Sequence, residues 1–115
     1  MKHLIALKNA FFYSMSGISY LLKERAFQYE LIIGCVLFAI ELFRCSSAFM
    51  RLYLLTAYVI VLITEALNTA IEAAIDRIGT EQHPLSKTAK DIGSSAAFIS
   101  QVHLGIIWIL SWIIK

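Results

Sequence analysis

The chain has 115 residues, and 59% of them are hydrophobic. A soluble domain of this size would have too little polar surface to cover what it buries, so the composition indicates a membrane protein. The net charge is only +2 and the basic residues are scattered, which excludes a nucleic-acid-binding protein and predicts no nucleic-acid partner.

The length limits the number of membrane spans. Crossing a hydrocarbon layer of about 30 Å takes about 20 helical residues, which leaves room for three spans, a short N-terminal segment and one modest loop. We therefore predict an all-α membrane protein that forms a single domain over residues 1–115. Cys35 and Cys45 lie ten positions apart and would be too distant to bridge if one helix carries both.

The N-terminal segment, residues 3–22, is predicted to be an amphipathic helix on the membrane surface. Its apolar positions are interrupted by Lys8, Asn9, Ser14 and Ser16, a pattern typical of a helix in the interface rather than of a spanning helix or a signal peptide.

The first span is predicted at about residues 26–46. Its most apolar run, LIIGCVLFAI, is short, so the span must be completed by Ala26–Tyr29 on one side and by snorkelling of Arg44 on the other. Glu41 and Arg44, three positions apart near the far interface, are expected to form an exposed ion pair of little energetic value.

The second and third spans are predicted at about residues 52–75 and 92–114. Gly79 is expected to stop the second helix, and Pro84 to start a new one after a turn. The third span has no formal charge, and its Trp108 and Trp112 suit a membrane interface.

The basic residues predict the orientation. The ten are divided seven to three: Lys2, Lys8, Lys23, Arg25, Arg77, Lys87 and Lys90 on one side, and Arg44, Arg51 and Lys115 on the other. The excess places the N-terminus and the second loop in the cytoplasm.

The segment ITEALNTAIEAAIDR carries polar side chains on one face of the second span. At 100° per residue, Glu65, Asn68, Glu72 and Asp76 fall within a sector of about 80°. An ionised carboxylate in hydrocarbon costs several kcal/mol unless it is paired, hydrated or bound to a cation. The face must therefore look into a helix bundle or a wet cleft.

Two explanations fit this face. In the first, Glu65 and Asn68 join helices while Glu72 and Asp76 sit in interfacial water. This explains Glu65 less well, because it lies about one and a half turns deeper than the helix end requires.

In the second explanation, carboxylates from three segments converge at the cytoplasmic level. Glu24 and Glu30 flank the start of the first span, while Lys90 and Asp91 flank the start of the third. Such carboxylates suit Mg²⁺, a lysine suits a phosphate, and the deeper Glu65 suits a base that deprotonates a buried hydroxyl. No Walker loop or protein-kinase signature is present, so the residues alone do not identify a nucleotide, and a proton or cation transporter stays open.

The run EALNTAIEAAIDRIGTEQHPLSKTAKDIGSSAA, residues 65–97, resembles the signature of the prokaryotic diacylglycerol kinase family. The matching motifs are ExxNxAIExxxD on the second span and an AKDxGSAA-like start of the third. The resemblance implies a homotrimer of three-span subunits with an amphipathic surface helix in the bacterial inner membrane. It also implies transfer of the ATP γ-phosphoryl group to a lipid hydroxyl, with Mg²⁺, at active sites between subunits.

The resemblance also implies residue roles. Glu65 matches the general base and Asn68 supports its geometry, while Glu24 and Glu72 match the residues that hold Mg²⁺. The implied nucleotide contacts are Tyr13, Glu24, Glu72, Glu81, His83, Lys90 and Asp91. The implied lipid pocket comprises Ser14, Glu30, Glu65, Ser94 and Trp108.

The predicted function is phosphorylation of diacylglycerol to phosphatidic acid. Close relatives in the family phosphorylate undecaprenol, which remains an alternative substrate. A small ion-coupled transporter is the alternative from another class, although it would normally need four spans. His83 has a simpler alternative explanation as a solvated turn residue, and Ile5 or Ala6 stands where relatives often carry an arginine.

Overall fold

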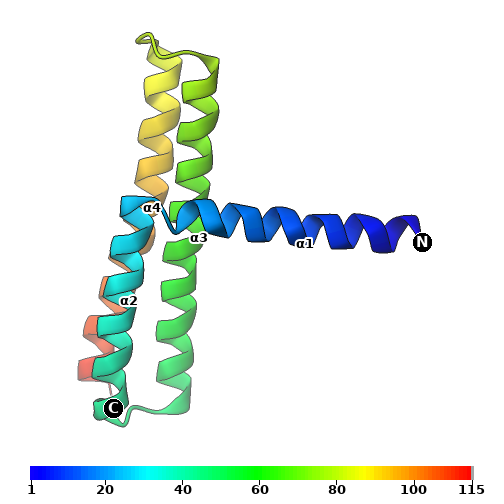
Figure 1. Cartoon of the computed structure of the whole chain (residues 1–115). Helices are drawn as coiled ribbons and strands as arrows, with labels where there is room; N and C mark the ends of the chain where they lie inside the picture. Colours follow the sequence, from blue (N-terminus) through cyan, green and yellow to red (C-terminus); the bar gives the residue numbers. More distant parts are fainter. Residues whose placement is uncertain (115) are drawn as a thin grey trace.

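The computed structural model describes residues 1–114 as four helices and shows no strand among them (Figure 1). These are α1 (Lys2–Leu21), α2 (Arg25–Arg44), α3 (Ala48–Ile78) and α4 (Pro84–Ile113). The last three are long and apolar enough to cross a membrane, which confirms the all-α fold with three spans. Lys115, which was counted in the charge balance, lies outside the described residues.

Helix α1 runs away from the other three helices, across their common direction (Figure 1). None of its residues is buried, and Phe11 and Phe12, for example, are more than half exposed. If α2, α3 and α4 cross the membrane, this direction places α1 along the membrane plane, as predicted for a surface helix.

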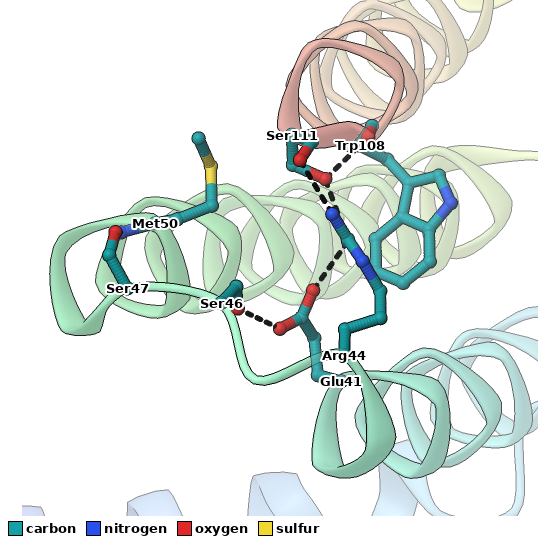
Figure 2. A network of polar contacts seen from close by, with 7 residues as sticks. All are labelled: Glu41, Arg44, Ser46, Ser47, Met50, Trp108 and Ser111. Carbon is teal, nitrogen blue, oxygen red and sulfur yellow. Dashed lines mark hydrogen bonds and ion pairs between the residues drawn. The ribbon is translucent and has the colours of Figure 1, made fainter. Parts of the chain in front are cut away.

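A tight connection joins α2 to α3. Cys45 ends α2 in the left-handed conformation, with φ 51° and ψ 37°. Ser47 then caps α3, since its Oγ accepts a hydrogen bond from the Met50 backbone N–H at 3.2 Å (Figure 2). Both cysteines are free, as the sequence predicted.

Helices α3 and α4 form a long hairpin. With 31 residues, α3 is about 46 Å long, which exceeds a hydrocarbon layer of about 30 Å. It ends at Gly79, and α4 begins with Pro84 at its first position, where proline is well tolerated. The hairpin continues past the corner between α1 and α2, so its connected end can extend out of the membrane (Figure 1).

The apolar core of a single chain is small. Ala57 and Val61 of α3 and Leu104 of α4 form its buried centre. In the most apolar window of each span only 17–28% of the residues are buried. The remaining apolar side chains need lipid or further protein to cover them.

A buried polar network joins the far ends of α2 and α4 (Figure 2). Arg44 Nη1 donates to Glu41 Oε1 at 2.6 Å and to Ser111 Oγ at 2.9 Å, while Nη2 donates to the Ser111 carbonyl at 2.6 Å. Ser46 Oγ donates to the other Glu41 oxygen. The guanidinium lies 3.9 Å from the ring centroid of Trp112.

The prediction that the Glu41–Arg44 pair is exposed is therefore wrong, while its predicted low energetic value stays a prediction. The two side chains are only 11–12% exposed, because the end of α4 closes over them. Arg44 also satisfies the Ser111 carbonyl, one of the last carbonyls of α4, which have no partner within their helix. The positive charge lies near the negative ends of both helix dipoles.

Replacing Arg44→Met should destabilise the protein by about 3–5 kcal/mol, because Glu41 would stay buried without its cation. The double variant Glu41→Leu, Arg44→Met should lose less, since neither charge is then left alone. Thermal unfolding in detergent micelles measures both. Equal losses in the two variants would show that the pair contributes only through packing.

Candidate active site

The predicted polar face of α3 is the face that packs against α4. The buried positions of α3 are Leu54, Ala57, Val61, Glu65 and Asn68, which follow one another at helical spacing. Glu65 is 7% and Asn68 8% exposed, so both continue the apolar core as polar residues. Glu72 and Asp76, further along the same face, are exposed. The face thus passes from a buried carboxylate to a hydrated one.

Close helix packing holds Asn68 in place. A Cβ atom on Gly93 of α4 would lie 2.6 Å from Asn68 Oδ1 and 3.3 Å from Ile71 Cδ1, so a larger residue would require the Asn68 side chain to move. Asn68 Nδ2 donates to Glu72 Oε1 at 3.4 Å, while Oδ1 is buried with no hydrogen-bond partner among residues 1–114. An unsatisfied buried oxygen of this kind is available to a ligand or to water.

A hydrogen bond between Thr64 and Ser100 fixes the register of α3 against α4. Thr64 Oγ1 and Ser100 Oγ lie 2.7 Å apart, and Ser100 is only 4% exposed. Because Thr64 directly precedes Glu65, this contact ties the depth of the carboxylate to α4.

Glu30 brings a carboxylate from α2 into the bundle. It is 7% exposed, and its Oε1 accepts a hydrogen bond from Gln101 Nε2 of α4 at 2.6 Å. The family resemblance predicts Glu30 in the site, whereas Gln101, Thr64 and Ser100 are not predicted from the sequence. The sequence feature that could have identified these three residues is a hydrogen-bonding side chain inside an otherwise apolar span.

A charged cleft of about 960 Å³ lies at the connected end of the hairpin. Its lining includes four predicted nucleotide residues, Glu81, His83, Lys90 and Asp91. Lys90 Nζ lies 2.7 Å from Asp76 Oδ1, and the Lys87–Asp91 pair spans 2.5 Å. These exposed pairs are weak and can exchange for a ligand's charges.

His83 has a local structural role as well. It is the N-cap of α4, and its Nδ1 accepts from the Leu85 backbone N–H at 3.1 Å. The side chain is exposed, so the cap also holds its ring at the cleft.

Other predicted site residues are not gathered by one chain. Tyr13 and Ser14 lie exposed on α1, which runs away from the hairpin, and Ser14 Oγ bonds only its own helix at Ala10. Trp108 lies near the far end of α4, with its ring 5.4 Å from the Arg44 guanidinium. Ser94 is exposed on α4.

Glu24 is the half-buried N-cap residue of α2. Within residues 1–114, no three or more His, Cys, Asp or Glu side chains are placed to hold a metal ion. Glu24 and Glu72 therefore do not belong to a complete all-protein metal site within one chain.

Three helices long and apolar enough to cross a membrane, with buried carboxylates between them and a charged cleft at the end of the hairpin, define an integral-membrane protein with a polar site. A profile described as prokaryotic diacylglycerol kinase matches residues 12–112. The chain belongs to the prokaryotic diacylglycerol kinase family, which makes it a multi-pass membrane lipid kinase with ATP as co-substrate.

Individual relatives agree over most of their length. The diacylglycerol kinase of Haemophilus influenzae is 37% identical over 109 residues, covering 94% of this chain and 90% of the relative. That of Pseudomonas aeruginosa is 37% identical over 101 residues, covering 87% and 82%. That of Escherichia coli is 39% identical over 102 residues, covering 87% and 84%. Because the chain belongs to this kinase family, the transporter alternative is rejected.

Replacing Gly93→Ala should destabilise the protein by about 1–3 kcal/mol and lower its activity, because the new methyl group displaces Asn68. The matched control is Gly105→Ala on the same helix, where a Cβ meets nothing within 4 Å. That control should be neutral or up to about 1 kcal/mol more stable, from helix propensity alone. Thermal unfolding and turnover of the two variants test the close crossing, and identical behaviour would contradict it.

Proposed function

We propose that this chain phosphorylates membrane diacylglycerol to phosphatidic acid by direct in-line transfer from ATP, as one domain spanning residues 1–115. The observation that carries the proposal is the α3 face, on which a buried Glu65 leads through Asn68 to the exposed Glu72. This arrangement offers a base shielded from water and, further along the helix, a hydrated carboxylate that can bind a cation. Phosphoryl transfer to a lipid alcohol needs both.

Glu65 is the proposed general base. Its carboxylate makes no side-chain hydrogen bond among the described residues, while it is nine-tenths buried on the face that meets α4. A carboxylate without a partner in this position can accept the proton of a lipid hydroxyl as that oxygen attacks the γ-phosphorus. Asn68 supports the geometry, one turn further along α3.

Glu24 and Glu72 are the proposed Mg²⁺ residues. Their carboxylates are the hard oxygen donors that this ion prefers, and Glu72 is exposed at the membrane boundary. Two carboxylates with nucleotide phosphates fit Mg²⁺, which is commonly held by one or two carboxylates and substrate phosphates. When bound, the ion neutralises charge on the transferring phosphoryl group.

The charged cleft is the proposed nucleotide site. Lys90 is placed to contact phosphates if it leaves Asp76, while Asp91, Glu81 and His83 offer acceptors and a ring to the rest of the nucleotide. Tyr13 completes the proposed contacts from the surface helix.

We propose a homotrimer with sites shared between neighbouring subunits. Two observations support it: most residues of the apolar windows are unburied, and α1 carries Tyr13 and Ser14 away from its own hairpin. The proposed lipid pocket contains Ser14, Glu30, Glu65, Ser94 and Trp108; one chain buries Glu30 and Glu65 in its bundle but leaves Ser14 exposed on α1 and Ser94 exposed on α4. A neighbouring copy can bring them together.

The proposed location is the bacterial inner membrane, with the N-terminus and the second loop in the cytoplasm. The charge balance supports this orientation, and so does the fold. The charged hairpin end, where ATP must bind, lies away from the α2–α3 connection (Figure 1).

Purified protein assayed side by side against diacylglycerol and undecaprenol in mixed micelles should show higher kcat/KM for diacylglycerol. The two lipids present similar hydroxyls to Glu65, so the difference reports the shape of the pocket. Transfer of labelled phosphate from ATP to each lipid is the measurement. Preference for undecaprenol would assign the chain to the alternative substrate.

The variant Glu65→Gln should lose transfer by about 10²–10⁴-fold, because it removes the base and preserves the shape of the side chain. Nucleotide binding and assembly should remain, as followed by ATP titration and by size-exclusion chromatography.

Glu72→Gln is the matched variant at the next carboxylate along the same face. It should weaken binding of Mg-ATP and shift the Mg²⁺ dependence to higher concentration. If Glu65→Gln also lost nucleotide binding, Glu65 would belong to the metal site instead. An unchanged Mg²⁺ dependence in Glu72→Gln would remove that residue from it.

A further inference from the structure

Glu30 is held by two different helices at two different atoms. Its carboxylate oxygen Oε1 accepts from Gln101 Nε2 of α4 at 2.6 Å. Its backbone carbonyl accepts from the Tyr58 hydroxyl of α3 at 2.9 Å. Because both the backbone and the tip of the side chain are anchored, its position and its rotamer are fixed together.

The Tyr58 contact depends on a glycine. A Cβ atom on Gly34, one turn after Glu30, would collide with the Tyr58 ring and hydroxyl. The absent side chain lets Tyr58 reach the α2 backbone. Helices α2 and α3 therefore approach each other closely beside Glu30.

Gln101 is in turn fixed relative to the proposed base. It follows Ser100, whose hydroxyl lies 2.7 Å from Thr64, the residue before Glu65. One interhelical contact therefore sets the depth of both Gln101 and Glu65. The chain places a carboxylate from α2 and another from α3 in a fixed relation through α4.

We propose that Gln101 is a positioning residue that orients the Glu30 carboxylate in the lipid-alcohol site. The inference rests on the proposed function, in which Glu30 lines that site. With Oε1 taken by the amide, Oε2 has no partner among the described residues and stays free to contact the lipid headgroup. Without the amide, a carboxylate that is only 7% exposed loses its hydrogen bond and turns toward water or another donor.

Gln101→Met keeps the length of the side chain and removes the amide. In mixed micelles it should raise the KM for diacylglycerol about tenfold, as expected for a lost charge-assisted hydrogen bond, and leave the KM for ATP within about twofold. The matched control is His103→Leu, a polar-to-apolar change two positions along the same helix. His103 is exposed and makes no hydrogen bond among the described residues, so His103→Leu should leave the KM for diacylglycerol and the KM for ATP unchanged.

Two further variants separate positioning from packing. Glu30→Ala should raise the lipid KM, and adding Gln101→Met to it should change nothing more, because Gln101 acts through Glu30. The exchange Glu30→Gln with Gln101→Glu restores a hydrogen bond but moves the carboxylate to α4. It should recover the thermal stability lost in Gln101→Met, while the KM for diacylglycerol stays raised.

These variants distinguish a failure of the Gln101 positioning role from a failure of the proposed lipid pocket. If Glu30→Ala raises the lipid KM while Gln101→Met does not, or if the exchange restores it, positioning by Gln101 is overturned and the proposed function stands. If Glu30→Ala leaves the lipid KM unchanged in an active kinase, Glu30 is not in the lipid site. The proposed pocket then fails together with the inference.

Discussion

The free energy of placing a carboxylate in hydrocarbon governs this fold. Glu30 and Glu65 lie inside apolar helices, where an exposed charge would cost several kcal/mol. Each is covered by a neighbouring helix, Glu65 on the face toward α4 and Glu30 beneath the Gln101 amide. The hairpin of α3 and α4 must therefore pack closely at this level, which explains why Gly93 meets Asn68 there.

Polar contacts hold α2 where apolar packing is sparse. The buried apolar centre joins α3 and α4, whereas α2 is fixed by Glu30 at one level and by Arg44 near its end. Because hydrogen bonds are directional, contacts at these two levels define both the height and the rotation of α2. That precision suits a span that carries a residue of the proposed lipid site.

The single chain has the chemistry of a lipid kinase without a closed site. The charged cleft lies at the connected end of the hairpin, the surface helix runs away from that hairpin (Figure 1), and the described residues form no complete metal-binding group. In the proposed homotrimer, neighbouring subunits and the nucleotide would supply the remaining contacts. Mg²⁺ characteristically uses such mixed ligands, with substrate phosphates supplying the oxygens that the protein lacks.

The sequence alone determined the helices, the three spans and the polar face of α3, because these depend on local periodicity and on the length needed to cross a membrane. The family motif added the roles proposed for Glu65 and Glu72. Only the tertiary structure showed that Arg44 donates a hydrogen bond to Ser111 and that Glu30 accepts one from Gln101. Those partners lie 67 and 71 positions away, and helical periodicity carries no information about which distant side chain meets which.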